Sequence, residues 1–243
     1  GNKPHESNRR GLVMMGPYVQ VPHPPDGERN GDFPLAFLDR DGVINRGKPG
    51  YVNGPDEVYL LPGAAEAIAE LNAAGYVVCV VTNQSPIARG LWGPATLEAI
   101  HREVQTRLHA VDSRATVHAF ITCPHRHEDR CPCRKPAPGM LFLGHNVLRG
   151  PDADGAHWQP VRYPIERIQV DWWGPRPVAE NGMDIMVGDR GSDMGAGWAF
   201  GARLYRVPAA VGLTAVGNRW MNEEDDGDSF QPVSYTHLTL PTT

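Results

Sequence analysis

The sequence predicts an α/β protein built on a doubly wound parallel sheet, and three observations support this fold class. Several short apolar runs are nearly continuous rather than alternating, which is typical of strands buried on both faces. Segments with helical periodicity lie between these runs, an order that favours a parallel sheet flanked by helices. Polar clusters follow the runs one after another, and ligands of doubly wound sheets collect at the carboxyl ends of strands.

The expected strands are short runs that end at turn-forming or polar residues. They cover residues 35–38, 76–81, 119–122, 184–187 and 203–207.

Four helices are expected between these strands. The first opens after Gly63 and closes at Gly75, with its apolar residues on one face. The second is amphipathic, because apolar residues recur at three- and four-residue steps over residues 97–111. Residues 139–148 and 192–200 predict the remaining two helices.

The length of 243 residues fits one large or elaborated domain. We expect an irregular N-terminal arm over residues 1–32, a folded domain over residues 33–215 and a C-terminal tail over residues 216–243. The tail is unlike the rest of the chain, and we expect it to be poorly ordered or non-native. Residues 150–182 interrupt the alternation of strands and helices, either as a substrate-facing insertion or as a surface flap that packs on the sheet.

Composition argues against several classes of function. The chain carries 23 basic and 28 acidic residues, a net charge of −5, which disfavours nucleic acid or an anionic membrane as the partner. No apolar stretch approaches the roughly 18 residues that span a bilayer. The apolar run that begins at Leu12 is shorter than the roughly 7–15 residues of a secretion signal, so we expect an arm there instead.

Three of the four cysteines lie close together in a segment that also holds two histidines. Cys123, Cys131 and Cys133, with one imidazole, supply the ligands of a closed tetrahedral site, which is typical of structural zinc. His125 and His127 are both candidates for the imidazole, and reduced thiols without a metal are the alternative. This pattern, unlike a disulfide framework, favours a reducing compartment, so we expect a cytoplasmic protein.

Two aspartates, Asp39 and Asp41, directly follow an expected strand. At that place they suit a nucleophile and its acid–base partner, although a turn with solvated acids uses the same residues. Further polar groups follow the next strands, namely Thr82, Lys135 and Asp189. Their succession at strand ends favours the catalytic interpretation.

In chain order, two aspartates, a threonine, a lysine and a Gly-Asp-x-x-x-Asp sequence resemble the motifs of the haloacid dehalogenase (HAD) superfamily of phosphohydrolases. The zinc loop over residues 123–133, placed before the motif lysine, narrows the resemblance to the histidinol-phosphatase and heptose-bisphosphate phosphatase branch. The resemblance covers residues 34–207 and implies a Rossmann-like HAD domain with a small zinc-binding loop and no large cap domain. It also implies Mg²⁺-dependent hydrolysis of a phosphomonoester through an aspartyl-phosphate intermediate.

The resemblance implies a role for each motif residue. Asp39 attacks phosphorus, and Asp41 protonates the leaving oxygen and then deprotonates the hydrolytic water. Asp39, Asp189 and the backbone carbonyl of Asp41 hold the catalytic Mg²⁺. Thr82 and Lys135 offset charge on the transferred phosphoryl group.

Other roles also follow from the resemblance. The structural zinc ligands are Cys123, His125, Cys131 and Cys133, and Asp193 supports Lys135 or the metal-bound waters without being a direct ligand. The residues expected near the substrate are Asn83, Ser85, Arg134, Arg190, Gly50 and Tyr51.

The substrate remains open between two branches of the family. The stretch from Thr82 to Gly90 resembles the heptose-bisphosphate branch, whereas the five-residue gap between His125 and Cys131 resembles the histidinol-phosphatase branch. We favour a heptose-type sugar bisphosphate, with histidinol phosphate or another small phosphate ester as the alternative. A catalytically inactive, zinc-stabilised binding module is the alternative from a different class. We expect the chain to act as a monomer on a small phosphorylated metabolite.

Overall fold

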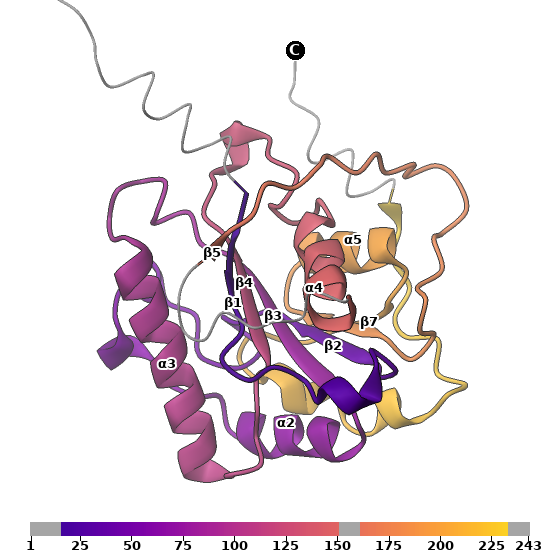
Figure 1. Cartoon of the computed structure of the whole chain (residues 1–243), viewed down its shortest axis with the longest axis horizontal. Coiled ribbons are helices and arrows are strands. Elements are labelled where there is room, and N and C mark those ends of the chain that lie inside the picture. The colour runs from indigo at the N-terminus through magenta and orange to yellow at the C-terminus, as the bar shows by residue number, and fades with distance from the viewer. Residues whose placement is uncertain (1–15, 151–160, 233–243) are drawn as a thin grey trace, which may run out of the picture.

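The computed structural model describes residues 16–150 and 161–232, and these residues form a sheet with the strand order β5-β1-β4-β3-β2-β6-β7 (Figure 1). In chain order the strands are β1 (Tyr18–Gln20), β2 (Leu35–Leu38), β3 (Val77–Asn83), β4 (Ala119–Cys123), β5 (Val161–Arg162), β6 (Ile185–Gly188) and β7 (Arg203–Arg206).

Five of the seven strands form the expected parallel core. Strands β3 and β6 flank β2 in parallel, and β4 and β7 continue the parallel arrangement outward. Strands β1 and β5 differ, because β1 pairs antiparallel with both β4 and β5. Because β1 lies inside residues 16–32, this part of the predicted irregular arm is a strand of the sheet. A strand of three residues is too short to show the alternation that identifies longer strands.

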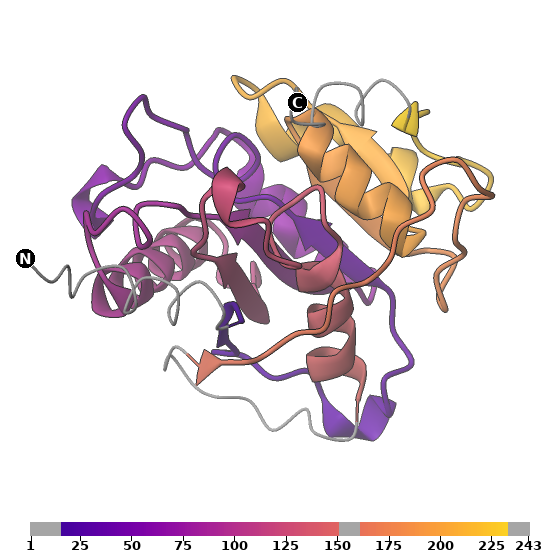
Figure 2. The same cartoon turned by 90° about the horizontal axis from the view of Figure 1, so that it is seen from above.

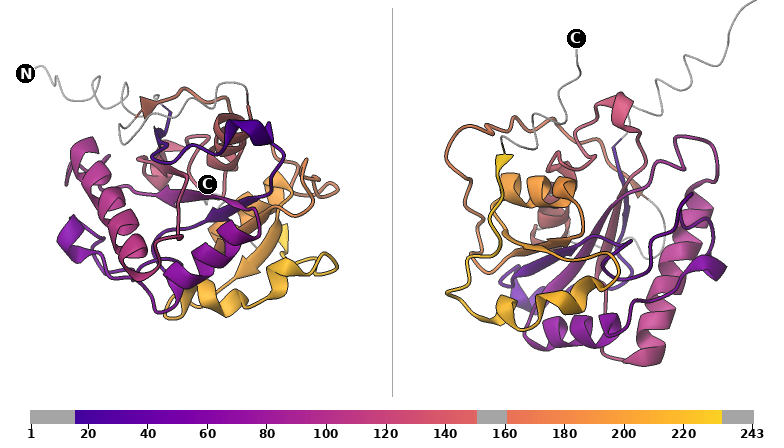
Figure 3. Two further views of the ribbon diagram at one scale, coloured as in Figure 1. Left: turned by 60° about the horizontal axis from the view of Figure 1, so that its bottom comes forward. Right: turned by 180° about the vertical axis from the view of Figure 1, so that it is seen from behind.

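Four α-helices cover the two faces of the sheet within the described residues (Figures 1 and 3). They are α2 (Ala64–Ala73), α3 (Pro94–Val111), α4 (Gly139–Arg149) and α5 (Gly191–Phe200). All four were expected from the sequence, and none of the described helices is long and apolar enough to cross a membrane.

The central strand β2 buries its side chains alternately in two cores. Leu35 and Phe37 pack in the core with α4 and α5, whereas Ala36 and Leu38 pack in the core with α2 and α3. Figure 2 shows these layers from above, with the parallel strands between the two pairs of helices. The predicted α/β class with a doubly wound sheet is therefore confirmed.

The described part of the segment that interrupts the alternation, residues 161–182, runs over the face covered by α4 and α5 (Figure 1). Trp172 stacks on Trp198 of α5, with ring centroids 5.6 Å apart and an angle of 21° between the planes. Tyr163 and Ile165 pack against the same core. None of the described residues in 163–182 lines the cavity at the carboxyl ends of the strands, so this part packs as a surface flap. Residues 151–160 lie outside the described part of the chain.

The described part of the expected tail, residues 216–232, packs on the sheet. The buried guanidinium of Arg203 on β7 donates hydrogen bonds to the carbonyl oxygens of Trp220, Asn222 and Asp225. Trp220 is itself buried. The prediction of a poorly ordered tail is therefore wrong for these residues, because one buried cation fixes a loop that carries no apolar periodicity. Residues 233–243 lie outside the described part.

Candidate active site

The carboxyl ends of β2, β3 and β6 open into a polar cavity of about 1100 Å³. Asp39 and Asp41 follow β2, Thr82 lies near the end of β3, and Asp189 follows β6. Because these three strands are parallel neighbours, their ends meet at one edge of the sheet. Lys135 reaches the same cavity from the loop between β4 and α4.

The predicted catalytic, magnesium and substrate residues all line this one cavity. They are Asp39, Asp41, Gly50, Tyr51, Thr82, Asn83, Ser85, Arg134, Lys135, Asp189 and Arg190. The cavity is also lined by cationic or polar side chains to which the sequence analysis assigns no place near the substrate, namely Arg46, Lys48, Arg89 and His127. The structure thus brings together motifs that lie up to 151 residues apart, from Asp39 to Arg190.

Lys135 is buried and its ammonium is held by three oxygens. The Nζ atom lies 2.6 Å from Oδ1 of Asp193 and 3.1 Å from Oδ1 of Asp39, and it donates to the carbonyl of Val81 at 2.7 Å. Burial opposes the charge on Lys135, but the carboxylates of Asp193 and Asp39 outweigh it and raise its pKa. The lysine is therefore a fixed positive charge beside Asp39.

Asn83 fixes the backbone of the same lysine. Its side-chain oxygen accepts a hydrogen bond from the backbone N–H of Lys135 at 3.1 Å, and its amide nitrogen donates to the carbonyl of Lys135 at 3.3 Å. Asn83 was predicted to lie near the substrate, and it does line the cavity, but its amide already binds protein. It positions the lysine.

Three carboxylates gather beside this ammonium. Oxygens of Asp39, Asp189 and Asp193 lie within 4.8 Å of one another, and Oδ1 of Asp189 is buried with no hydrogen-bond partner in the part of the chain that the structure describes. Burial, followed by the charge of Asp193, raises the pKa of both Asp39 and Asp189. This excess of negative charge and the free carboxylate oxygen suit a hard divalent cation such as Mg²⁺. The residues present therefore fit the expected magnesium site.

Asp41 differs from its neighbours because its carboxylate is saturated with donors. Arg40 donates to both carboxylate oxygens at 2.9 and 3.1 Å, Asn45 donates at 2.9 Å, and Gln84 donates at 3.2 Å. Burial alone would raise the pKa of Asp41. The charge of Arg40 and these hydrogen bonds outweigh burial, so the pKa of Asp41 lies below its usual value. Sequence reasoning missed Arg40, Asn45 and Gln84, although all three lie inside the motifs that it singled out.

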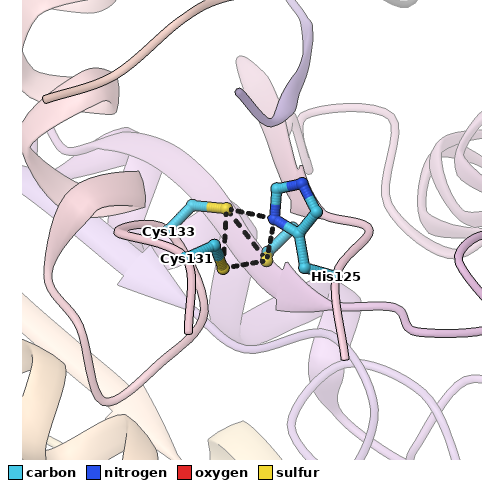
Figure 4. A group of neighbouring side chains, drawn as sticks. His125, Cys131 and Cys133 are labelled. Carbon is cyan, nitrogen blue, oxygen red and sulfur yellow. Dashed lines mark hydrogen bonds between the residues drawn. The ribbon is translucent and has the colours of Figure 1, made fainter. Parts of the chain in front are cut away.

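The four expected zinc ligands form a compact cluster. Figure 4 labels three of them, His125, Cys131 and Cys133. Nδ1 of His125 lies 3.1 Å from Sγ of Cys133 and 3.4 Å from Sγ of Cys123, and Cys131 completes the group. His127 lines the cavity instead, so it is not the histidine of this cluster. All four ligand atoms lie within 4.8 Å of one another, which fits a tetrahedral Cys₃His site.

The cluster is tied to the cavity through Arg134. The backbone N–H of Arg134 donates to Sγ of Cys131 at 3.3 Å, and its guanidinium donates to the carbonyl of His125 at 3.0 Å. Arg134 and Lys135 therefore enter the cavity directly from the loop that carries the Cys/His cluster. The cysteine cluster thus helps to place the cationic groups of the site.

A second polar group in the cavity is centred on Ser85. The hydroxyl of Tyr51 and the Nε of Arg89 each lie 3.2 Å from Oγ of Ser85. Tyr51 has a positive φ of 75°, a left-handed conformation that is costly for a residue with a Cβ atom. Its ring is held over the cavity by this turn and by the contact with Ser85.

Comparison with known proteins identifies the family. No family model matches the chain. The D-glycero-beta-D-manno-heptose-1,7-bisphosphate 7-phosphatase of Bordetella bronchiseptica is 47% identical over 136 residues, which cover 56% of this chain and 73% of the relative. The D-glycero-alpha-D-manno-heptose-1,7-bisphosphate 7-phosphatase of Mycobacterium tuberculosis is 35% identical over 189 residues, 77% of this chain and 80% of the relative. The chain belongs to the heptose-bisphosphate phosphatase family of HAD phosphatases.

A solved member of the heptose-bisphosphate phosphatase family supports the fold and the enzyme class. The D,D-heptose 1,7-bisphosphate phosphatase of B. bronchiseptica, crystallised with magnesium and phosphate, aligns over 86% of this chain and 98% of its own. The TM-score is 0.56 and the sequence identity is 31%. The predicted resemblance, fold class and phosphatase activity are confirmed.

Proposed function

We propose that this phosphatase removes the 7-phosphate from a D-glycero-D-manno-heptose 1,7-bisphosphate. The observation that carries the proposal is the cavity itself, whose lining combines the carboxylate of Asp39 with the guanidinium groups of Arg89 and Arg134. A sugar with two phosphates matches such a cavity, since one phosphate meets Asp39 and the other meets arginines. The two relatives differ in the anomer that their names specify, so the proposal includes both anomers.

The reaction begins with Asp39, whose carboxylate attacks phosphorus while the bond from phosphorus to the sugar oxygen breaks. The protonated form of Asp41 gives its proton to that oxygen, which leaves as the sugar hydroxyl; the lowered pKa makes this form scarce but a strong acid. Asp41 then takes a proton from a water that attacks the aspartyl-phosphate, and inorganic phosphate leaves with Asp39 restored. Lys135, held against Asp39, and the hydroxyl of Thr82 offset negative charge on the phosphoryl oxygens.

Asp39, Asp189 and the backbone carbonyl of Asp41 are the groups that would hold Mg²⁺. When bound, the ion supplies positive charge next to the transferred phosphoryl group. The unpartnered Oδ1 of Asp189 and the crowding of carboxylates support this assignment.

Zinc is proposed as a structural ion held by the Cys₃His cluster of Cys123, His125, Cys131 and Cys133. Four protein ligands leave no open position for substrate, which is the arrangement of structural rather than catalytic zinc. Burial raises the pKa of the Cys123 and Cys133 thiols, and a bound cation is what would keep such thiols ionised. The free state of all four cysteines supports a reducing, cytoplasmic location.

The second phosphate is assigned to the group around Ser85, where Arg89 contacts Ser85 and Arg134 also lines the cavity. The planar guanidinium groups suit bidentate contact with phosphate oxygens. Arg190 and the backbone at Gly50 complete the proposed substrate contacts.

The test is phosphate release by the Mg²⁺-loaded protein from both anomers of the heptose bisphosphate, from histidinol phosphate and from 4-nitrophenyl phosphate. We expect the highest kcat/KM for one anomer of the bisphosphate. A higher kcat/KM for histidinol phosphate would instead assign the chain to the other branch. Asp39→Asn, purified in the same way, is the control for contaminating phosphatases, and size-exclusion chromatography checks the predicted monomer.

A further inference from the structure

The carboxylate of Asp41 is held from behind by a line of buried side chains. The guanidinium of Arg40 is fully buried, and its Nε and Nη2 atoms donate to the two oxygens of Asp41. Its remaining nitrogen, Nη1, lies 3.1 Å from Nε2 of His101 on α3. His101 in turn lies 2.6 Å from Oε1 of Gln20 on β1, so the line crosses from the cavity to the antiparallel strand.

The direction of each hydrogen bond in this line is fixed by chemistry. Arginine has donors only, so Nε2 of His101 must accept from Arg40. Burial, and secondarily the charge of Arg40, lower the pKa of His101, so the ring is neutral and carries its hydrogen on Nδ1. That hydrogen is donated to Oε1 of Gln20. The ring also stacks on Phe120 at 4.3 Å, which fixes its plane.

Among the described residues, only the oxygen of the Gln20 side-chain amide makes a hydrogen bond. Its oxygen accepts from His101, whereas its buried Nε2 has no hydrogen-bond partner among the described residues. Leaving a buried amide nitrogen unpaired is costly, and buried side chains that serve only packing are normally satisfied at both ends. Gln20 is therefore placed to hold the tautomer and orientation of His101.

We infer that Gln20 and His101 are positioning residues for Asp41, acting through Arg40. The inference rests on the proposed function, in which Asp41 protonates the leaving oxygen. With Nη1 held by His101, the planar fork of Arg40 has one orientation, and this orientation sets the plane of the Asp41 carboxylate. Strand β1, which lies outside the parallel core, thereby contributes to catalysis.

The test compares Gln20→Met with Gln105→Met. Both glutamines are buried, but the side chain of Gln105 on α3 hydrogen-bonds to the backbone of Ala115 and Val117 and, among the described residues, makes no hydrogen bond to Arg40 or His101. The measurement is kcat/KM for the heptose bisphosphate, an alkyl ester, and for 4-nitrophenyl phosphate, whose leaving group needs little protonation. Because kcat/KM reports steps through the first irreversible one, the ratio isolates the acid role of Asp41.

We expect Gln20→Met to lower the alkyl-to-aryl ratio about fivefold, the effect of one lost hydrogen bond. His101→Phe keeps the stacked ring but offers Arg40 no acceptor, and it should lower the ratio by about tenfold or more. His101→Gln, which places an amide oxygen near the position of Nε2, should recover part of that loss. Gln105→Met should leave the ratio unchanged, even where it lowers thermal stability.

An unchanged ratio in Gln20→Met and His101→Phe overturns the inference, as does an equal fall in Gln105→Met. If the wild-type enzyme does not hydrolyse the heptose bisphosphate, the proposed function is wrong. The variants are then compared on an alkyl phosphate that the wild-type enzyme does hydrolyse, which tests the inference on its own. If the variants do not fold, nitrogen-15 NMR of wild-type His101 decides the matter. A ring protonated on Nδ1 alone supports the inference, and a ring protonated on Nε2 overturns it.

Discussion

His118 is expected to make the stability of the sheet sensitive to mild acid. It immediately precedes β4, and its Nδ1 accepts a hydrogen bond from the backbone N–H of Val78 on β3 at 3.0 Å. A proton on Nδ1 would remove this acceptor. Burial, with smaller effects of the charges on His23 and Arg29, lowers the pKa of His118 from 6.5 to about 4.

The direction in which pH changes the stability follows from the direction of this pKa shift. The folded pKa lies below the unfolded value, so between pH 6.5 and pH 4 the unfolded chain binds more protons than the folded protein. The stability that depends on neutral His118 is fully present above pH 6.5 and is lost progressively as the pH falls towards 4. At pH 5 the loss from this one group is about 2 kcal/mol. His101, whose pKa is also lowered by burial, acts in the same direction.

The assay is urea unfolding at pH 7.5 and pH 5 of the wild-type protein and of His118→Asn. Asparagine can place its side-chain oxygen near the position of Nδ1 and accept from Val78, but it does not titrate. We expect the free energy of unfolding of the variant to fall less between the two pH values, by about 2 kcal/mol. Any loss of metal at pH 5 affects both proteins alike. An equal fall in both proteins would refute the account of His118.

Three further predictions concern the site and the C-terminal segment. Asp39→Asn should abolish phosphate release while leaving fold and zinc content intact, as measured by Mg²⁺-dependent turnover and metal analysis; residual activity within about tenfold of wild type contradicts the nucleophile role. Cys131→Ser should lower zinc content, thermal stability and activity together, and a zinc-free variant with full activity would contradict a structural zinc. Arg203→Met should lower the free energy of unfolding in urea by about 3 kcal/mol, because several buried acceptors lose their donor, whereas Arg206→Met, at an exposed position of the same strand, should change it little.

The sequence predicted those strands whose two faces are covered by helices. In the central strands β2, β3, β4 and β6, burial on both faces leaves a nearly continuous apolar run, which is a local signal. Strand β1 gave no such signal, because it has three residues and pairs with β4 about a hundred positions later in the chain. Pairing over that distance depends on tertiary structure and leaves no periodicity in the sequence.

The residues of the candidate site also fall into those that the sequence could predict and those that it could not. Asp39, Asp41 and Lys135 could be predicted because each belongs to a short motif at a strand end. His101 belongs to none of these motifs, yet it is fully buried against Arg40. A polar residue on the inner face of an amphipathic helix reveals its role only when its partner, here 61 positions away, is in place.

The position of Lys135 links the Cys/His loop to the proposed chemistry of the cavity. The lysine lies two residues after Cys133, its backbone is held at both polar atoms by Asn83, and its ammonium is held by Asp193 and Asp39. A loop residue is ordinarily less well fixed than one on a strand or helix. Here the Cys₃His cluster fixes the chain before the lysine and β3 fixes its backbone, so in the proposed mechanism the charge meets the phosphoryl group already oriented. If the cluster holds zinc as proposed, loss of zinc should act on kcat through misplacement of Lys135, even though none of the four cluster residues lines the cavity.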